Sequence, residues 1–284
     1  MTVLVFGRSG QVATELARIL PDARFLSRSE ADLADPAACA AAIAALCPDA
    51  VVNAAAWTAV DRAEAEEDAA RVINADAPGA MARAAATLGV PFLHLSTDYV
   101  FDGGGGPPRR EDDPVAPLGA YGRTKLDGER LVAAAGGAHV ILRTSWVFAG
   151  HGQNFVRTML RLGRERPELR IVADQRGGPT PAADIAGALV TVLAAFREGR
   201  GQSGIFHFAG APASTWADFA EAIFAGAGLA PKVIRIATAD YPTPARRPLN
   251  SVLDCGRIGR AYGIAQPDWR PGLTAALAEL ETAT

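Results

Sequence analysis

A tyrosine and a lysine four positions apart have the residue types and spacing that acid–base chemistry needs. Tyr121 and Lys125 stand in the segment Tyr-Gly-Arg-Thr-Lys, and on a helix they would share one face. A free tyrosine titrates near ~10, and a neighbouring ammonium favours the phenolate, so we expect Lys125 to lower the pKa of Tyr121. A tyrosine tuned in this way can act as a general acid–base. The hydroxyl of Thr97 can orient the same substrate oxygen, which makes these three residues the candidate catalytic set.

The alternative is an ordinary tyrosine–lysine pair on a surface helix. Two observations favour the catalytic interpretation. Among the 28 basic residues of the chain, lysine occurs at 125 and 232 and every other one is arginine, so a lysine is unusual here. The pair also follows a Ser-Thr segment at a predicted strand end, downstream of a nucleotide-binding pattern.

The nucleotide-binding pattern is Gly-x-x-Gly-x-x-Ala, placed between a predicted strand and a predicted helix. Gly7 permits a tight turn, Gly10 lets the backbone approach a pyrophosphate, and Ala13 lets the helix pack closely on the strand. The N-terminus of the helix then stabilises the phosphate charge. We therefore expect a dinucleotide cofactor at this turn.

The second predicted strand ends at Arg28, close to the position where Rossmann units often place an acidic residue on the ribose. A guanidinium is suited to a 2′-phosphate, so we expect NADPH to be accepted, with NADH as the other candidate cofactor. A solvated surface arginine is the alternative interpretation. The small residues at 54–56 follow the third strand and leave room for a ribose and pyrophosphate.

The elements that must position these residues alternate between strand and helix. Apolar or β-branched runs predict strands at 2–6, 24–27, 50–53, 91–96, 139–144 and 205–209. Ala-rich stretches predict helices at 11–20, 36–46, 61–88, 120–135 and 181–196, with Pro78 kinking or restarting the long one. This alternation predicts the α/β class, a Rossmann-type doubly wound parallel sheet. We assign residues 1–149 and 181–209 to that domain, and 150–180 and 210–284 to a smaller, discontinuous α/β substrate-binding lobe.

The composition and charge of the chain bear on its expected partners, metal content and location. The chain has 284 residues, 49% hydrophobic, and a formal net charge of −3, which gives no electrostatic reason to expect nucleic acid or an anionic membrane as partner. No apolar run reaches the ~20 residues of a membrane-spanning helix, and the first residues show no signal peptide. The three cysteines and four histidines lack metal-ligand spacing, so we predict no metal site. We expect a cytoplasmic protein.

The motifs together resemble the extended short-chain dehydrogenases/reductases and, within them, the dTDP-4-dehydrorhamnose reductase family. The similarity covers essentially the whole chain, and its further motifs lie at 52–61, 143–148, 154–155, 174–180 and 241–248. The resemblance implies NADPH- or NADH-dependent reduction of the C4 keto group of dTDP-4-dehydro-L-rhamnose to dTDP-L-rhamnose, a precursor of cell-surface polysaccharide. Its partner is therefore a small-molecule nucleotide sugar.

The resemblance also implies roles for individual residues. Tyr121 would protonate the alkoxide, Lys125 would tune Tyr121 and hold the nicotinamide ribose, and Thr97 would hydrogen-bond the oxygen. The residues expected to contact the substrate are Thr97, Asp98, Tyr121 and Trp146. An alternative interpretation of Trp146 is a core residue beside a strand. With the motif residues, the candidate cofactor set is Gly7, Gly10, Gln11, Val12, Arg28, Asp32, Leu33, Ala55, Ala56, Trp57, Thr58, Tyr121 and Lys125.

By the same analogy, the thymidine diphosphate would be approached by Phe155, Arg176, Arg246 and Arg247. Some family members hold Mg²⁺ with acidic residues at a dimer contact. Glu15 and Glu279 are candidates for that role, but the sequence offers no full ligand set, and the oligomeric state, including a homodimer, is left open. The alternatives to this function are another nucleotide-sugar 4-ketoreductase and a non-catalytic NADP-binding regulatory homologue.

Overall fold

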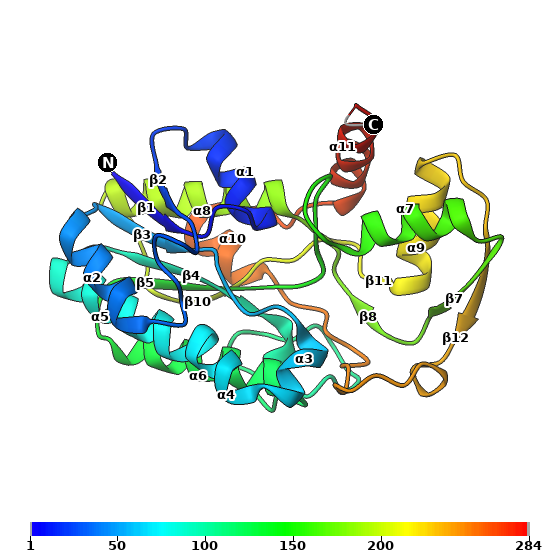
Figure 1. Ribbon diagram of the computed structural model, residues 1–284, viewed down its shortest axis with the longest axis horizontal. Helices are drawn as coiled ribbons and strands as arrows, with labels where there is room; N and C mark the ends of the chain where they lie inside the picture. Colours follow the sequence, from blue (N-terminus) through cyan, green and yellow to red (C-terminus); the bar gives the residue numbers. More distant parts are fainter. Residues whose placement is uncertain (1, 283–284) are drawn as a thin grey trace.

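A six-stranded parallel sheet forms the centre of the computed structural model, which describes residues 2–282 (Figure 1). Its strand order is β10-β5-β4-β3-β1-β2, a doubly wound arrangement in which β1 lies beside the edge strand β2 and the later strands continue to the opposite edge. The strands are β1 (Val3–Phe6), β2 (Arg24–Leu26), β3 (Ala50–Asn53), β4 (Phe92–Thr97), β5 (His139–Thr144) and β10 (Gly204–His207). The predicted fold class is confirmed, and each predicted strand lies within one or two residues of its observed bounds.

Helices cover both faces of the sheet because both faces of its strands are apolar. On β1, Val3 and Val5 pack in one core with α1 (Gln11–Ile19), α8 (Ala182–Arg197) and α10 (Gly256–Tyr262). The alternate residues of β1, Leu4 and Phe6, pack in the other core. That second core is covered by α2 (Pro36–Leu46), α5 (Ala77–Leu88) and α6 (Ala120–Ala134). Figure 1 shows α1 and α8 above the sheet and α2, α5 and α6 below it.

The predicted helix at 61–88 is divided into several pieces. It contains α3 (Val60–Ala65), α4 (Glu67–Arg71), a π-helical turn η1 (Val72–Asp76) and α5. Pro78 lies in the first turn of α5, directly after the π turn, and the backbone stays helical from Glu67 to Leu88. The helix predicted to kink or restart at Pro78 therefore continues through it with a π turn just before the proline, while the break at Glu66 was not foreseen.

A second group of elements lies to one side of the sheet (Figure 1). It contains α7 (Phe155–Glu165), α9 (Trp216–Gly226) and α11 (Trp269–Thr282), which share a hydrophobic core with β7 (Glu168–Val172). β7 pairs in parallel with β12 (Lys232–Ile236), and neither strand was predicted. Short pairings complete this region: β6 (Val147–Phe148) with β9 (Thr180–Pro181), and β8 (Arg176–Gly177) with β11 (Ser214–Thr215), with the 3₁₀ turn η3 (Thr238–Asp240) after β12. A second 3₁₀ turn, η2 (Asp98–Val100), follows β4 of the central sheet.

One segment departs from the predicted division of the chain. Leu253, Cys255, Ile258 and Tyr262 lie within the predicted lobe at 210–284, yet they are buried in the core of the central sheet. Their apolar side chains cover the β10 edge, which would otherwise be exposed. The assignment of the remaining boundaries stays a prediction.

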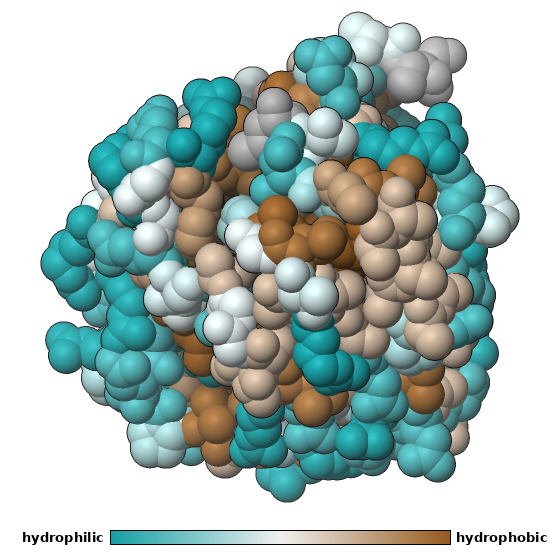
Figure 2. Space-filling model, turned by 90° about the vertical axis from the view of Figure 1, so that its left-hand side faces the viewer, coloured by the Kyte–Doolittle hydropathy of each residue, from teal (hydrophilic) through white to brown (hydrophobic). Residues whose placement is uncertain are grey.

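The outer face of the sheet domain is mixed in character. Figure 2 shows this face with hydrophobic residues gathered near its middle and hydrophilic ones around its rim. None of the helices in the described part of the chain is long and apolar enough to cross a membrane.

Candidate functional site

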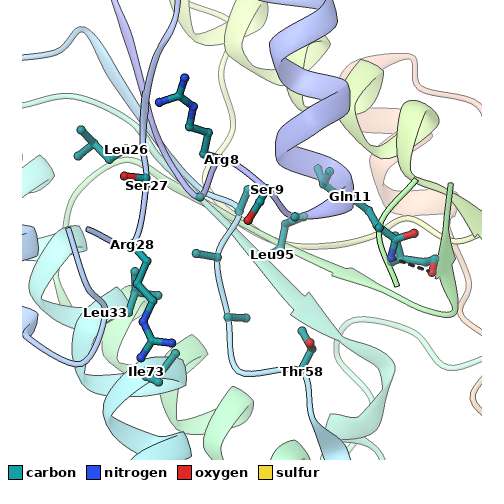
Figure 3. A pocket seen from close by; sticks show the side chains of 18 of the residues that line it. Arg8, Ser9, Gln11, Leu26, Ser27, Arg28, Leu33, Thr58, Ile73 and Leu95 are labelled. Carbon is teal, nitrogen blue, oxygen red and sulfur yellow. Dashed lines mark hydrogen bonds between the residues drawn. The ribbon is translucent and has the colours of Figure 1, made fainter. Parts of the chain in front are cut away.

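A cavity of about 750 Å³ opens at the carboxyl ends of β1, β2, β3 and β4 (Figure 3). This is the edge of a doubly wound sheet where ligands bind, because the loops leaving neighbouring strands diverge there. Most predicted cofactor residues line the cavity: Gly7, Gly10, Gln11, Val12, Arg28, Asp32, Leu33, Ala55, Ala56, Thr58, Tyr121 and Lys125. The chain therefore brings predicted residues from four separate segments to one cavity.

The turn after β1 has the geometry that the glycine pattern predicts. Gly7 has φ +105°, a conformation that favours glycine, and a Cβ there would lie 3.4 Å from Ala54 and Ala55. Gly10 caps the N-terminus of α1 without a side-chain hydrogen bond to the helix. Because the first N–H groups of a helix have no intrahelical partner, this end of α1 can donate to a phosphate.

The mouth of the cavity carries two arginines. Arg28 lies on the lining with its Nε 3.1 Å from Asp32 Oδ2, and its side chain is 81% exposed. Arg8 lies on the lining as well, and Figure 3 shows the two side chains on either side of Ser27. Asp32 is held by the Ala34 N–H at 3.0 Å, so it anchors Arg28 at the cavity. A phosphate at this position would meet cations on two sides.

Trp57 is the one predicted cofactor residue that does not reach the lining of the described cavity. Its indole N–H donates to the Ala59 carbonyl at 3.1 Å, and the guanidinium of Arg62 lies 4.8 Å from the ring centroid. Its backbone N–H donates to Asn74 Oδ1 at 2.9 Å. The side chain thus packs outward while its backbone is fixed by the π turn, and Ala56 and Thr58 on either side face the cavity.

Tyr121, Thr97 and Asp98 lie together at the inner part of the site. Thr97 Oγ1 donates to Asp98 Oδ1 at 3.0 Å and lies close enough to Tyr121 to favour its phenolate. Burial raises the pKa of Tyr121 to about 12, and burial also raises the pKa of Asp98 to about 7. The predicted lowering of the Tyr121 pKa is therefore wrong for this arrangement, because desolvation outweighs the opposing effect of Thr97.

Lys125 contacts the end of β4. Its Nζ donates to the Leu95 carbonyl at 2.7 Å and lies 3.4 Å from His94 Nε2. Burial lowers the pKa of Lys125 to about 8, and the carboxylate of Glu129 partly offsets that effect. Lys125 and Tyr121 nevertheless line the same cavity, so both can face a bound cofactor.

Trp146 lies in a strained, aromatic setting. Its φ is +45°, which a bulky side chain rarely adopts, and its indole stacks on Trp216 with ring centroids 3.5 Å apart. A Cβ on Gly177 would come within 2.5 Å of the indole. Both interpretations of Trp146 thus find support: it packs against neighbours, and its strained backbone is a feature found at binding sites.

The residues assigned by analogy to the diphosphate lie in separate places. Phe155 packs against Trp216 at 4.6 Å between centroids, and Arg176 is exposed on β8. Arg247 Nη2 pairs with Asp61 Oδ2 at 2.8 Å. Its Nη1 is buried and finds no acceptor among the described residues, so Arg247 has a free donor beside the Asp98 region.

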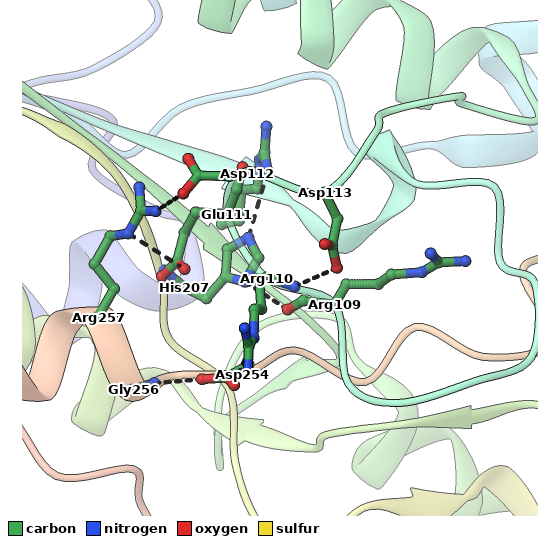
Figure 4. A network of polar contacts seen from close by, with 10 residues as sticks. Arg109, Arg110, Glu111, Asp112, Asp113, His207, Asp254, Gly256 and Arg257 are labelled. Carbon is green, nitrogen blue, oxygen red and sulfur yellow. Dashed lines mark hydrogen bonds and ion pairs between the residues drawn. The ribbon is translucent and has the colours of Figure 1, made fainter.

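Polar contacts around the loop before α6 join Glu111 and Asp112 to His207 and Arg257 (Figure 4). Arg143 on β5 pairs through two nitrogens with Glu129 on α6, and both side chains are 2% exposed. Glu111 accepts the His207 N–H at 3.1 Å, and His207 Nδ1 lies 3.1 Å from the Arg109 carbonyl. These contacts fix the loop before α6, which positions Tyr121.

The donor set near the C-terminal helix does not fit Mg²⁺. Glu15, His151 and Glu279 place ligand atoms within 4.8 Å of one another. Arg18 pairs with both carboxylates, with Nη1 2.9 Å from Glu15 Oε1, and His151 Nε2 lies 2.6 Å from the same oxygen. Mg²⁺ requires about six oxygen ligands in octahedral geometry, and a guanidinium already neutralises these two carboxylates.

Several lining residues were not predicted. These are Arg8, Ser9, Leu26, Ser27, Ala31, Ile73, Leu95, Ser96, Thr144, Val147, Gly152 and Gln153. The sequence carried a signal for Arg8 and Ser9, which lie inside the glycine pattern, but none for Gly152 and Gln153, which reach the cavity from a distant loop. Thr144 Oγ1 is buried on the lining with no protein partner among the described residues, which leaves a hydroxyl free for a ligand.

Comparison with known proteins gives consistent results. The model of a family described as "RmlD substrate binding domain" matches residues 1–282. A protein named dTDP-4-dehydrorhamnose reductase from Burkholderia thailandensis is 48% identical, covering 95% of this chain and 96% of its own length. A crystal structure of a reductase of that name from Clostridium acetobutylicum has TM-score 0.92 at 35% identity, covering 99% and 100% of the two chains.

A further solved structure contains a bound cofactor. It is a dTDP-4-dehydrorhamnose reductase from Bacillus anthracis in complex with NADP, with TM-score 0.92 at 32% identity, covering 98% of this chain and 100% of the other. The cavity described above lies at the sheet edge where a nicotinamide dinucleotide fits the glycine turn, the free helix end and the flanking arginines.

Proposed function

Because the chain belongs to the dTDP-4-dehydrorhamnose reductase family, we propose that it reduces the C4 keto group of dTDP-4-dehydro-L-rhamnose and so forms dTDP-L-rhamnose. One observation supports the chemistry of this proposed reaction. Tyr121, with Thr97 beside it, lies on the wall of the cofactor cavity together with Lys125. A proton donor, a neighbouring hydroxyl and a lysine thus meet at the place where a keto sugar would face the nicotinamide.

The residues present supply the proton and hold the reactants. When bound, the reduced nicotinamide supplies the hydride that C4 of the hexose accepts. Tyr121 donates its hydroxyl proton to the resulting alkoxide and is left as the phenolate. Thr97, whose hydroxyl donates to Asp98 Oδ1 in this structure, would turn that single proton to the sugar oxygen as the alkoxide forms. Trp146 would pack against the C–H face of the sugar.

The cofactor is held by backbone and by cations. The N–H groups at the start of α1 would donate to the pyrophosphate, and Lys125 would hold the nicotinamide ribose. Arg28 and Arg8 flank the place of the adenosine ribose, which favours NADPH over NADH because a 2′-phosphate adds two negative charges there.

A coupled assay tests the substrate assignment. dTDP-glucose is converted by its 4,6-dehydratase and the 3,5-epimerase, this protein is added, and oxidation of NADPH or NADH is followed by its absorbance in parallel reactions. We expect oxidation that requires both upstream enzymes, and NMR of the product that identifies dTDP-L-rhamnose.

The other outcomes separate the alternatives. Oxidation with a different product configuration at C4, or with another nucleotide, would assign the protein to a different 4-ketoreductase. Protein that binds NADPH but gives no oxidation with any of these sugars would contradict the proposal.

A further inference from the structure

Lys125 is docked on groups of β4 that the proposed reduction does not use. Its Nζ lies 2.7 Å from the Leu95 carbonyl oxygen and 3.4 Å from His94 Nε2, and the side chains of Lys125 and His94 are both buried. The carbonyl accepts a hydrogen bond from either an amine or an ammonium. The nature of the second contact depends on whether the His94 nitrogen carries a proton.

The orientation of the Asn53 amide decides that question. Asn53 Oδ1 accepts the backbone N–H of Ala55 at 3.1 Å, which fixes the oxygen on that side of the amide. The Nδ2 group therefore faces His94, where it lies 3.2 Å from Nδ1. Turning the amide over would place two donors, Nδ2 and the Ala55 N–H, against each other in a buried site, which is costly.

His94 consequently has one defined tautomer. Because Asn53 Nδ2 can only donate, Nδ1 of His94 must be the acceptor and carry no proton. A neutral imidazole keeps its proton on the other nitrogen, so Nε2–H points at Lys125. Burial, together with the charge of Lys125, holds the pKa of His94 well below its usual range, so the ring stays neutral.

We propose that His94, fixed by Asn53 as the Nε2–H tautomer, is a positioning residue that favours the neutral amine of Lys125 and directs its ammonium form toward the cavity. An amine at Nζ accepts from Nε2–H while it donates to the Leu95 carbonyl, and all three groups are then satisfied. An ammonium has no lone pair and would face the Nε2–H as a second donor. The ammonium form therefore avoids this contact between two donors when it moves from His94 to the side on which Tyr121 and the cofactor lie.

The other charges around Lys125 do not replace this contact. Glu129, one turn along α6, favours the ammonium, but Arg143 holds both of its carboxylate oxygens. Tyr121, one turn earlier, is neutral because burial raises its pKa to about 12. The lowered pKa of Lys125, about 8, agrees with a site in which the amine is the better-satisfied form.

The consequence for the reaction rests on the proposed function. After Tyr121 gives its proton to the alkoxide, a proton moving from the Lys125 ammonium to the phenolate restores the Tyr121 hydroxyl. That transfer leaves an amine, which returns to His94 and Leu95 until it takes a proton from solvent. His94 would thus allow Lys125 to lose its proton and take up another near neutral pH.

Two NMR measurements on the intact protein test the proposal without any assay of activity. In protein labelled with ¹⁵N-histidine, long-range ¹⁵N–¹H correlations identify which ring nitrogen of His94 carries the proton. In protein labelled with ¹³C-lysine, the Cε signals are followed against pH. The chain has Lys125 and Lys232 as its lysines, so Lys232→Arg assigns them, and the exposed Lys232 is an internal reference.

We expect the His94 proton on Nε2, and a Lys125 midpoint well below that of Lys232. In His94→Phe, which removes the N–H and keeps a ring beside Phe92, the Lys125 midpoint should rise by about one unit, a tenfold change in its proton dissociation constant. A proton on Nδ1, or a midpoint that falls or stays unchanged in this variant, would overturn the proposal. If the variant does not fold, the position of the His94 ring proton in the unmodified protein still tests the proposal. Failure of the coupled reductase assay would bear on the proposed function and leave these readings untouched.

Discussion

At the scale of single residues, the site depends on one hydroxyl. Tyr121 is partly buried, keeps its proton at neutral pH and lies beside Thr97. A raised pKa makes a weaker acid, so the proton leaves readily only when an alkoxide, itself a strong base, has formed beside it. The arrangement therefore suits donation late in the reaction, after negative charge has appeared on the sugar oxygen.

Replacing Tyr121 by phenylalanine should remove that donor and little else. We expect kcat in the coupled assay to fall by roughly 10²–10⁴-fold, the usual size of an acid–base contribution, with NADPH binding retained. Tyr99→Phe is the matched control, because Tyr99 contacts Tyr121 edge-on with centroids 5.8 Å apart and loses the same atom. A Tyr121→Phe enzyme as fast as the Tyr99→Phe control would contradict the assignment of the proton donor.

Arg28 should determine the choice between the two cofactors. In Arg28→Ala, KM for NADPH should rise by about tenfold or more while KM for NADH changes little, because only NADPH carries the 2′-phosphate that a guanidinium binds. Arg24→Ala is the control, since Arg24 lies on β2 just before the turn that carries Arg28, pairs with Glu30 and is absent from the cavity lining. Equal Michaelis constants for NADPH in the wild type and in Arg28→Ala would show that Arg28 is a solvated surface residue with no role in binding the 2′-phosphate.

At the scale of elements, α6 reaches its place through close backbone contact. A Cβ on Gly128 would lie 2.1 Å from the Asn74 carbonyl oxygen of the π turn. Asn74 in turn binds the backbone of Trp57 and the Thr124 hydroxyl, so this contact aligns the helix that carries Tyr121 and Lys125 with the cofactor loop.

Gly128→Ala should therefore lower the free energy of unfolding by about 1–3 kcal/mol, because backbone must move to admit the methyl group. Gly187→Ala is the control within another helix, α8, where an added Cβ meets nothing within 4 Å. It should raise stability by about 0.5–1 kcal/mol, since alanine favours helix. Urea unfolding of the two variants measures both changes, and a loss of stability in both would rule out the close contact as the cause.

His207, on β10 against the loop that precedes α6, should make the stability of the fold sensitive to acid. Burial, with the nearby Arg143, lowers the pKa of His207 to about 3, while the unfolded chain titrates near 6.5. Between these values the unfolded state binds one more proton, so stability rises with pH and is lost as the pH falls from about 6.5 toward 3.

His207→Asn should flatten that dependence. The asparagine Nδ2 can still donate to the Arg109 carbonyl, but it does not titrate. In urea unfolding at several pH values below 6, the slope of stability against pH should decrease by about 1.4 kcal/mol per unit, the equivalent of one proton. Parallel slopes in the two proteins would mean that His207 is protonated in the native state.

The sheet could be predicted from the sequence because its strands are short apolar runs buried on both faces, such as 50–53 and 139–144. The pairings β6–β9 and β8–β11 could not, since two-residue strands carry no periodicity and depend on contacts between distant segments. The same holds for the site. The Gly7 turn and the Tyr121–Lys125 spacing are local, whereas the docking of Lys125 on His94 depends on the pairing of β3 with β4.

At the scale of the whole molecule, an ion-pair cluster joins the sheet domain to the elements beside it. Glu15 and Arg18 belong to α1, His151 follows β6, and Glu279 lies on α11. Glu15 is nearly buried, so it needs a cationic or donor partner, and Arg18 and His151 both supply one. The cluster therefore holds α11 against α1 through its own charges.

This arrangement predicts that the protein works without a divalent cation. Dialysis against EDTA should leave both the unfolding midpoint and the rate of the coupled assay unchanged, because Arg18 occupies the place between the two carboxylates that a metal would take. Arg18→Met should lower stability by about 1 kcal/mol, a small value because half of the Arg18 side chain is exposed and screened by water. It should also create a response to Mg²⁺, which would then neutralise the unpaired carboxylates. Arg161→Met, which removes an exposed pair with Glu165, should show neither effect. A wild-type protein that loses stability in EDTA and regains it with Mg²⁺ would show that a metal displaces Arg18 from this cluster.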